Sequence, residues 1–348
     1  MAKTILGIDG GHDTLKLALV SGSQIKKTVI VPMPNNLIKD GRPVSPETYG
    51  ELLRTVMKEN GIKCNGAAIV LSNHAVFTKN IAVPRMNEKQ LLVNIPYEFR
   101  DYITDELKNY VFDYAIISDP QNGGAANEEK KEGEDAESED PSGAMQILAV
   151  AAPVSFMDEL RETCRKAGVR MLGAAPEISS YITLIRNMKD EYRPESGEYC
   201  ILDLGYREVR MYMFKNDVSV ATRVLEIGMS VLDDVIAEIY NVDVHLAHTY
   251  LTSNFENCQQ REECVNTFNN IAIELMRAVN FYNFSNPDSR LSDIWLCGGG
   301  AVIPALESAV ESTLDLRVHK AYELVGSEIE ECESYVQAIG AALSISGR

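Results

Sequence analysis

The chain lacks the features of secreted, membrane-spanning and disulfide-bonded proteins. Its seven cysteines are odd in number and scattered, and no two stand in a CxxC pair, which is typical of a reducing compartment. No apolar run reaches the roughly 18 residues that cross a bilayer. The first residues enter an expected strand directly and have no signal-peptide layout. We therefore expect a cytoplasmic protein.

Basic charge is also scarce. The sequence has 33 Lys and Arg against 51 Asp and Glu, a net charge of −18, and this sign does not favour nucleic acid as the main partner. Much of the negative charge lies in residues 121–143, which include no large apolar side chain. We expect a solvated loop there between two strands, with a docking segment for a basic partner as the alternative.

Length and hydrophobic pattern favour two lobes. At 348 residues and 45% hydrophobic content, the chain is too long for one ordinary core. Its hydrophobic periodicity predicts strands and helices in alternation. Strands are expected at 3–9, 15–20, 25–31, 67–71, 76–83, 111–118 and 145–151. Helices are expected at 46–60, 85–103 with an interruption at Pro96, 155–167, 176–188, 230–241, 243–253, 260–284, 304–313 and 335–345.

The most informative segment lies near the N-terminus. An apolar strand ends in Asp9-Gly10-Gly11, the chain turns as far as Thr14, and an alternating apolar strand returns through Lys16. This pattern predicts a β-hairpin whose turn offers backbone N–H groups, a carboxylate and a lysine. Such a turn can hold phosphate and magnesium.

Two later segments repeat and extend this pattern. Residues 200–214 read as a second strand-turn-strand unit with Asp203 and Gly205 at its turn. Residues 294–304 run from a strand through a triple-glycine turn into a helix. Two Asp-x-Gly hairpins followed by a triple-glycine turn resemble the superfamily of actin, heat-shock chaperone and sugar-kinase ATPases.

Along almost its whole length the chain resembles the PilM family of type IV pilus assembly proteins, which are related to the division protein FtsA. The resemblance implies an α/β, actin-like (ribonuclease H-like), two-lobed ATPase fold with an inserted α+β subdomain. The position of that subdomain favours PilM and FtsA over actins and chaperones, which carry their insertions elsewhere. The segments that carry the resemblance are 9–16, 85–103, 223–232, 274–282 and 296–306.

The resemblance and the order of elements imply five segments. Residues 82–174, which read as β-α-β-β-α-β, are expected to form the inserted subdomain with the acidic loop at 121–143. The other segments are the first-lobe core at 1–81, the first-lobe connecting helix at 175–190, the second lobe at 191–334 and the closing helix of the first lobe at 335–348.

The same resemblance implies an ATP site with Mg²⁺. Asp9 and Asp203 would hold the ion, because Mg²⁺ takes one or two carboxylates together with phosphate oxygens. Asp203 and Glu177 are the candidate catalytic residues, with Glu177 orienting the attacking water. An acidic residue that simply favours a helix's first turn is the alternative interpretation of Glu177. The other residues implied in nucleotide binding are Gly10, Gly11, Thr14, Lys16, Gly205, Glu274, Arg277, Gly298, Gly299 and Gly300.

Both turns depart from the family pattern, which places small hydroxyl residues there. The first turn has His12 and Asp13, and the second has Tyr206, Arg207 and Glu208. Acidic side chains in the turns place like charge near a phosphate, whereas the arginine either offsets that charge or takes the place of the γ-phosphate. We therefore expect ATP binding with weak or absent hydrolysis, and a scaffold that binds no nucleotide stays an alternative.

Other candidate sites are weaker. His245 and His248 are spaced i, i+3 on an expected helix, but no acidic or cysteine partner is evident in the sequence. We therefore expect two surface histidines and not a metal site. His319 is likewise expected to stand alone, and Cys258 and Cys264 are expected to be ordinary thiols.

The resemblance implies a cytoplasmic assembly protein of the type IV pilus machine. Such proteins bind the cytoplasmic tail of PilN, an inner-membrane protein, and communicate with pilus motor ATPases. A PilN-like tail would recruit this chain to the inner face of the membrane, and self-association is left open.

Two other functions are less favoured. An FtsA-like division protein needs an amphipathic membrane helix, and residues 338–348 offer no basic stripe with bulky apolar residues. A small-molecule kinase needs an Asp general base for a substrate hydroxyl, and no additional segment that would carry one is evident.

Overall fold

The computed structural model describes residues 3–118 and 144–346, and the acidic segment expected as a loop at 121–143 lies outside them. Contacts between Cα atoms divide the chain into two compact units. The large unit consists of Met1–Leu71 and Glu162–Arg348, and the small unit is Ser72–Arg161.

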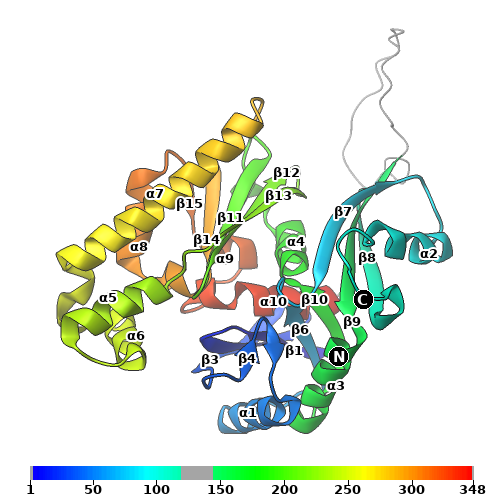
Figure 1. The fold of residues 1–348 in the computed structure, drawn as a ribbon, viewed down its shortest axis with the longest axis horizontal. Helices are drawn as coiled ribbons and strands as arrows, with labels where there is room; N and C mark the ends of the chain where they lie inside the picture. Colours follow the sequence, from blue (N-terminus) through cyan, green and yellow to red (C-terminus); the bar gives the residue numbers. More distant parts are fainter. Residues whose placement is uncertain (1–2, 119–143, 347–348) are drawn as a thin grey trace. The chain divides into compact units, whose positions relative to one another are not determined.

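The first sheet of the large unit has the strand order β10-β6-β1-β2-β3 (Figure 1). β1, β2 and β3 form an antiparallel meander, whereas β6 runs parallel to both β1 and β10. β1 is apolar almost throughout because it lies inside the sheet and is covered on both faces. The strands are β1 (Thr4–Gly10), β2 (Thr14–Ser21), β3 (Gln24–Pro32), β6 (Gly66–Leu71) and β10 (Arg170–Pro176).

The second sheet repeats the plan of the first. Its order is β13-β12-β11-β14-β15, with an antiparallel meander of β11, β12 and β13 and with β14 parallel to β11 and β15. The two sheets therefore define a first and a second lobe with one shared topology. The strands are β11 (Glu198–Leu204), β12 (Val209–Lys215), β13 (Val218–Leu225), β14 (Asp293–Cys297) and β15 (Arg317–His319).

Two helices cover opposite faces of the first sheet. Side chains alternate along a strand, and a Cβ on Gly7 would meet the backbone of Ala338 in α10, whereas a Cβ on Gly10 would meet Tyr49 in α1. Only glycine at position 7 permits this close approach of α10. α10 also contacts α4 and β14, so it touches elements of both lobes. The bounds are α1 (Pro46–Glu59) and α10 (Cys332–Ser346).

α1 begins where the sequence supplies a cap. The Thr48 N–H donates to Ser45 Oγ over 3.2 Å, and Pro46 occupies the first turn, where its missing N–H costs nothing. Leu53 and Val56, three residues apart, lie on the buried face of the helix.

Helices cover both faces of the second sheet as well. One face packs on α5, α6, α7 and α8 in the largest core cluster among the described residues. The other face packs on α4, where the rings of Tyr181 and Tyr212 lie 5.1 Å apart. The helices are α4 (Glu177–Asn187), α5 (Ser230–Tyr240), α6 (Val244–Thr252), α7 (Glu262–Ser285), α8 (Pro304–Thr313) and α9 (Ala321–Val325).

The small unit has a sheet of its own. Its strand order is β7-β9-β8, and α2 packs Leu91, Ile95 and the following Phe99 into the core of this unit. β7 begins before residue 82, and β10 pairs with β6 of the first sheet, so the small unit starts and ends earlier than the expected segment 82–174. The elements are β7 (Phe77–Val83), α2 (Glu88–Glu98), β8 (Tyr110–Ser118), β9 (Met145–Pro153) and α3 (Val154–Ala167), whose last turns belong to the large unit.

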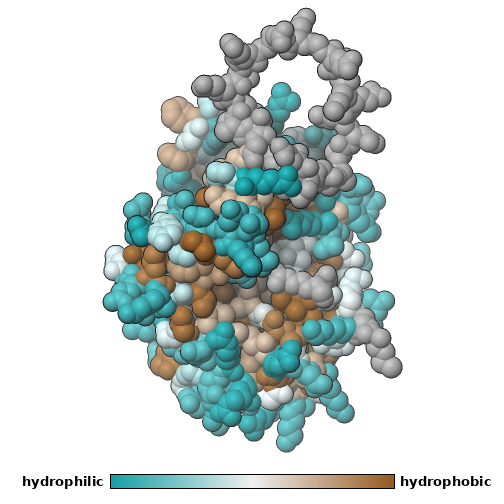
Figure 2. Space-filling view, turned by 90° about the vertical axis from the view of Figure 1, so that its right-hand side faces the viewer, coloured by the Kyte–Doolittle hydropathy of each residue, from teal (hydrophilic) through white to brown (hydrophobic). Residues whose placement is uncertain are grey.

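Pro96 does not interrupt its helix as expected. It lies inside α2, which ends two residues later at Glu98, and residues 99–103 continue as turns closed by bonds from Tyr102 and Ile103 to the Phe99 carbonyl. Several large apolar side chains of this segment are exposed, namely Leu92, Val93, Tyr97 and Tyr102. On the face shown in Figure 2, hydrophobic residues likewise group between hydrophilic ones.

No helix within residues 3–118 and 144–346 is long and apolar enough to cross a membrane.

The remaining elements are short connections. The connections are β4 (Ile38–Lys39), β5 (Arg42–Pro43) and the 3-10 turns Leu107–Asn109, Asp190–Tyr192, Phe255–Gln260 and Gly299–Val302.

Candidate functional site

The two hairpin turns of the large unit are built alike. In the first turn (residues 11–14) the Gly11 N–H donates to the Thr14 carbonyl over 3.0 Å, and in the second turn (residues 205–208) the Gly205 N–H donates to the Glu208 carbonyl over 3.1 Å. Within the described chain, the N–H groups of the two residues after each glycine make no hydrogen bond. Successive N–H groups of this kind form a concave surface that suits an anion.

Each turn is flanked by an acidic residue and a cation on adjacent strands. The strand register places Asp9 of β1 opposite Lys16 of β2, and Asp203 of β11 opposite Arg210 of β12. The duplication of the sheet therefore extends to the charged side chains.

In the first lobe, Lys16 Nζ lies 3.4 Å from Asp9 Oδ2, and both side chains are largely buried. Burial alone lowers the pKa of Lys16, but the carboxylates of Asp9 and Asp203 outweigh it and raise that pKa above its ordinary value. Lys16 is therefore positively charged at neutral pH and interacts electrostatically with both aspartates.

In the second lobe, Asp203 is held from two sides. Its Oδ2 accepts a 2.7 Å hydrogen bond from Gln337 Nε2 of α10, and Gln337 also reaches the Tyr181 hydroxyl at 3.2 Å. A Cβ on Gly298 would lie 2.5 Å from Asp203 Oδ1, so the start of the triple-glycine turn packs directly on this carboxyl group. Burial raises the pKa of Asp203, with a further contribution from Asp9 against the opposing effect of Arg210.

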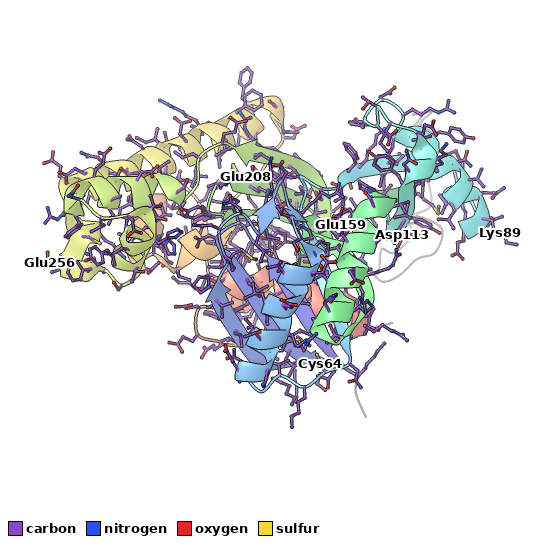
Figure 3. The ribbon with its side chains drawn as sticks, turned by 60° about the horizontal axis from the view of Figure 1, so that its bottom comes forward. Cys64, Lys89, Asp113, Glu159, Glu208 and Glu256 are labelled. Atoms are coloured by element: carbon purple, nitrogen blue, oxygen red, sulfur yellow. The ribbon has the colours of Figure 1, made fainter. Side chains whose placement is uncertain are left out.

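Glu177, the candidate for orienting water, is buried and occupied by protein partners. It is the first residue of α4, and its Oε2 accepts from the Tyr212 hydroxyl at 2.9 Å and from Arg210 Nη1 at 2.9 Å. Arg210 also pairs with Glu208 of the second turn, which Figure 3 labels. Glu177 and Asp203 together outweigh burial and raise the pKa of Arg210. The carboxylate of Glu177 is thus neutralised within the protein.

The two aspartates fit a magnesium ion by their chemistry. Mg²⁺ needs one or two carboxylates and keeps water or phosphate oxygens as its other ligands. Burial raises the pKa of Asp203 and the like charge of Asp9 adds to that rise, so a divalent cation beside both carboxylates would relieve their repulsion. Within residues 3–118 and 144–346 there is no group of three or more His, Cys, Asp or Glu side chains that could hold a metal unaided.

The triple-glycine turn and the Glu274–Arg277 pair on α7, both expected to bind nucleotide, do not contact each other through hydrogen bonds or ion pairs in the described residues. Gly298 adopts φ +86° and precedes a 3-10 turn, and Gly299 has open space where a Cβ would lie, which leaves room beside its backbone. Glu274 and Arg277 pair with each other on the surface of α7. In the described residues, no hydrogen bond or ion pair joins either side chain to Gly300 or its neighbours.

The unusual turn residues have specific partners. Glu208 is drawn to Arg210, and Asp13 lies 3.5 Å from His248 Nε2, so both acidic side chains have a nearby cation or imidazole. Arg207 is exposed and lowers the pKa of His12, second to burial.

The histidine expectations were wrong in part. His248 Nδ1 lies 3.0 Å from Asp233 Oδ2, and His245 Nε2 lies 2.9 Å from Asn35 Nδ2, so the pair on α6 does have acidic and polar partners from distant segments. His319 is also engaged, since its two ring nitrogens each lie 2.7 Å from a carboxylate, of Asp293 and Glu323. Glu323 follows His319 by four residues, a spacing that the sequence does reveal, whereas Asn35, Asp233 and Asp293 lie too far away in sequence for spacing to reveal them.

The cysteines are free thiols. Cys258 and Cys264 are both buried, and burial raises the pKa of the Cys264 thiol to about 11. A protonated, buried thiol is a poor nucleophile, so the expectation of ordinary thiols for this pair holds.

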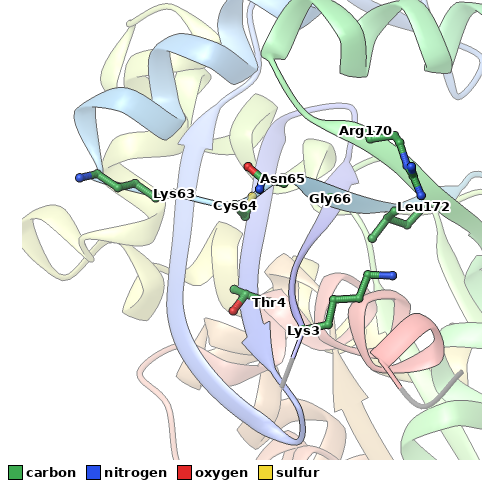
Figure 4. A pocket seen from close by; sticks show the side chains of 8 residues that line it. All are labelled: Lys3, Thr4, Lys63, Cys64, Asn65, Gly66, Arg170 and Leu172. Atoms are coloured by element: carbon green, nitrogen blue, oxygen red, sulfur yellow. The ribbon is translucent and has the colours of Figure 1, made fainter. Parts of the chain in front are cut away.

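A pocket of about 770 Å³ lies away from the hairpin turns (Figure 4). It sits where β1, β6 and β10 begin, whereas Asp9 lies where β1 ends. Figure 3 accordingly shows Cys64, which lines the pocket, far from Glu208. In Figure 4, Lys3 and Arg170 extend toward each other and Lys63 points away. The pocket includes none of the candidate site residues.

Three site residues escaped sequence reasoning. Arg210 had a signal, because it follows Asp203 by the same interval that separates Lys16 from Asp9, and a repeat search would have found it. Gln337 and Tyr212 had no such signal, because their role depends on how distant elements pack.

The fold agrees with that of known structures. A PilM-PilN type IV pilus biogenesis complex superposes with a TM-score of 0.77 at 21% identity, covering 98% of this chain and 98% of that one. The ethanolamine utilization protein EutJ from Carboxydothermus hydrogenoformans superposes with a TM-score of 0.59 at 12% identity, covering 99% and 89% of the two chains. These likenesses confirm the actin-like α/β fold.

Comparison at the level of sequence identifies the family. No curated protein sequence matches the chain. The profile of the family described as type IV pilus assembly protein PilM matches residues 7–130 and 136–332, which is most of the chain. The chain therefore belongs to the PilM family of type IV pilus assembly proteins.

Proposed function

We propose that this chain is a nucleotide-responsive assembly protein of the type IV pilus machine. It binds Mg·ATP between the two hairpin turns and binds the cytoplasmic tail of a PilN-like inner-membrane protein, which recruits it to the inner face of the membrane. ATP hydrolysis is weak or absent.

One observation carries nucleotide binding: the duplicated arrangement of turn, acid and cation. Lys16 and Arg210 supply positive charge beside two turns whose N–H groups suit phosphate oxygens. Asp9 and Asp203 are the carboxylates that would hold Mg²⁺, whose positive charge would polarise the phosphates.

The state of Glu177 supports weak hydrolysis. A residue that orients attacking water must be reachable by that water and accept a hydrogen bond from it. Glu177 is buried and its Oε2 accepts from Tyr212 and Arg210, which leaves little access for water. Glu177 therefore acts mainly as a buried link between α4 and β12, and nucleotide serves as a ligand that favours one arrangement of the lobes.

The partner follows from the family and from the PilM-PilN complex that shares the fold. The small unit offers exposed apolar side chains on α2, Leu92 and Val93, together with Tyr97. Exposed apolar groups on an ordered helix suit a short peptide with apolar anchors. A soluble PilN-like tail peptide is thus the expected ligand of this unit.

Calorimetric titration with Mg·ATP tests the nucleotide site. The native protein should bind in the micromolar range, and Asp9→Ala/Asp203→Ala should abolish binding because no carboxylate would hold Mg²⁺. Glu162→Ala, a surface change on α3, serves as control and should bind as the native protein does. Absence of binding by the native protein would contradict the nucleotide proposal and leave a scaffold that acts through its surface.

A second titration tests the partner. A PilN-like tail peptide should bind the native protein, and Val93→Asp/Tyr97→Asp should weaken binding about tenfold or more because charge replaces apolar contact. A scrambled peptide is the control. Equal binding of both peptides, or no effect of the double variant, would remove the small unit as the docking site.

A further inference from the structure

One face of α6 meets the first lobe through both of its histidines. His245 Nε2 lies 2.9 Å from Nδ2 of Asn35, which lies between β3 and β4. His248 Nε2 lies 3.5 Å from Oδ2 of Asp13 in the first turn. Residues three apart share a helix face, so these two contacts belong to one surface. The first turn is therefore in direct contact with a helix of the second lobe.

Aromatic contacts join the same groups. The His12 ring stacks on Tyr206 of the second turn, with centroids 5.9 Å apart and an interplanar angle of 6°. Tyr206 in turn meets His248 edge-on at 6.1 Å. The two turns and α6 thus form one cluster beside the proposed phosphate site.

His248 lies between two carboxylates. Its Nδ1 is 3.0 Å and 3.2 Å from the two oxygens of Asp233, a fully buried residue on α5, and its Nε2 faces Asp13. A neutral imidazole donates from only one nitrogen, whereas imidazolium donates from both. Only the charged form can satisfy Asp233 and Asp13 together.

We propose that His248 is a positioning residue of the nucleotide site: as imidazolium it ties Asp13 of the first turn to Asp233 of α5, and this link holds the turn and neutralises its carboxylate. The inference rests on the proposed nucleotide function and adds its regulation by pH. When His248 loses its proton, Nδ1 keeps the buried Asp233 and the link to Asp13 is lost. The negative charge of Asp13 then repels the phosphates of a bound nucleotide.

The direction of the pH dependence follows from the surroundings of His248. The hydrogen bond with Asp233 raises the pKa of His248, and burial opposes it only partly. A raised pKa means that the link is complete below the ordinary histidine pKa and is lost as pH rises through the folded value. Asp13, Asp233 and the Tyr206 ring face the imidazole itself. The other charged and titratable groups of the cluster are His12 in the first turn, Arg207 in the second, Asp234 on α5 and His245 on α6 itself.

The link itself can be tested without nucleotide. A proton NMR titration of the histidine rings, with His248 assigned by its loss in His248→Gln, gives the pKa of His248 in the full chain. Asp13→Asn should lower that pKa because one of the two carboxylates loses its charge, and Asp40→Asn, a change in the neighbouring loop, should not. An unchanged pKa in Asp13→Asn would overturn the link.

Nucleotide binding tests its consequence. Between about pH 7 and about pH 9, above the ordinary histidine pKa, the affinity of the native protein for Mg·ATP should fall about fivefold. His248→Gln should bind weakly at every pH, because Asp13 keeps its charge. Asp13→Asn and the double variant should bind tightly with no pH dependence, because no charge is left to neutralise.

The two proposals fail in different ways. If the native protein binds no Mg·ATP at any pH, the proposed nucleotide function fails, and the NMR titration alone decides whether the link exists. If nucleotide binds and His248→Gln keeps the native pH profile, the positioning role is overturned while the nucleotide site stands. A tight, flat profile in the double variant together with a lowered pKa in Asp13→Asn supports both.

Discussion

At the scale of single residues, Arg210 organises the second half of the site. It occupies the position that Lys16 holds in the first lobe. It forms ion pairs with Glu177 and Glu208, and the charge of Asp203 helps to raise its pKa. A buried ion pair is a weak source of net stability, but loss of one partner is costly because a charge is left buried. Loss of Arg210 should therefore cost more free energy, by leaving buried carboxylates without a cation, than the ion pair itself contributes to stability.

Arg210→Met should lower the free energy of unfolding by about 3 kcal/mol, because Glu177 loses the cation that neutralises it. Adding Glu177→Gln to this variant should restore most of the loss, since the remaining side chain carries no charge. Urea unfolding at neutral pH measures both effects.

A surface pair provides the control for that experiment. Arg165 pairs with Glu162 on α3 at 2.5 Å, with the arginine well exposed, and exposed pairs contribute little. Arg165→Met should leave the unfolding curve unchanged. If the two arginine variants behaved alike, the buried network would not be a stability determinant.

At the scale of elements, the turn between β14 and α8 depends on its first glycine. Gly298 has φ +86°, and a Cβ there would meet Asp203 Oδ1 at 2.5 Å and the Leu204 carbonyl oxygen at 2.8 Å. Gly299, the next residue, has nothing within 4 Å of a Cβ. A side chain should therefore be excluded at position 298 and tolerated at position 299.

Gly298→Ala should destabilise the protein by about 2 kcal/mol or more, because it combines an unfavourable φ with a clash against Asp203 and backbone. It should also weaken Mg·ATP binding by displacing that carboxylate. Gly299→Ala is the matched control and should leave the melting temperature near the native value. Thermal melts of both variants decide the point, and equal melting temperatures would contradict this account of the turn.

The sequence predicts elements whose signals are local, but it does not predict features that depend on the packing of distant segments. The hairpins, α1 and the triple-glycine turn were accessible because their signals lie within a few residues, such as Ser45 before Pro46 or a strand that ends in Asp9. The assignment of β10 to the first sheet was not accessible, because a parallel strand finds its partner through a crossover.

The same division applies to the candidate site. Asp9 and Asp203 were predicted from their motifs, whereas Gln337 contacts Asp203 and His248 contacts Asp13 from helices far along the chain. Neither a glutamine in an apolar helix nor two histidines at helical spacing carries a chemical signature. Only the packing of α10 and α6 gives these side chains a role.

At the scale of the whole molecule, the chain has two units with separate cores. The core of the small unit includes Phe99, which is 1% exposed and whose ring centroid lies 5.8 Å from that of Phe112. The proposed nucleotide residues all belong to the large unit. Damage to the small core should therefore be local.

Phe99→Ala should destabilise the small unit by about 4 kcal/mol through loss of ring contacts and the cavity left behind. Hydrogen exchange should show faster exchange in β7, β8 and β9 with native protection in β1 and β11. Binding of Mg·ATP should be unchanged. Equal loss of protection in both units would mean that they unfold as one.

The position of α10 has a consequence for how the protein is made. α10 packs on β1 at Gly7 and supplies Gln337 to Asp203, although it is the last helix described in the chain. On a ribosome, β1 is synthesised long before α10, so the sheet must wait for its covering helix. The apolar face of the first sheet is exposed throughout that interval, and non-local closure of this kind slows folding. We therefore expect the nascent chain to bind chaperones before α10 is made, and the hydrogen bond from Gln337 to Asp203 to form only after α10 has docked.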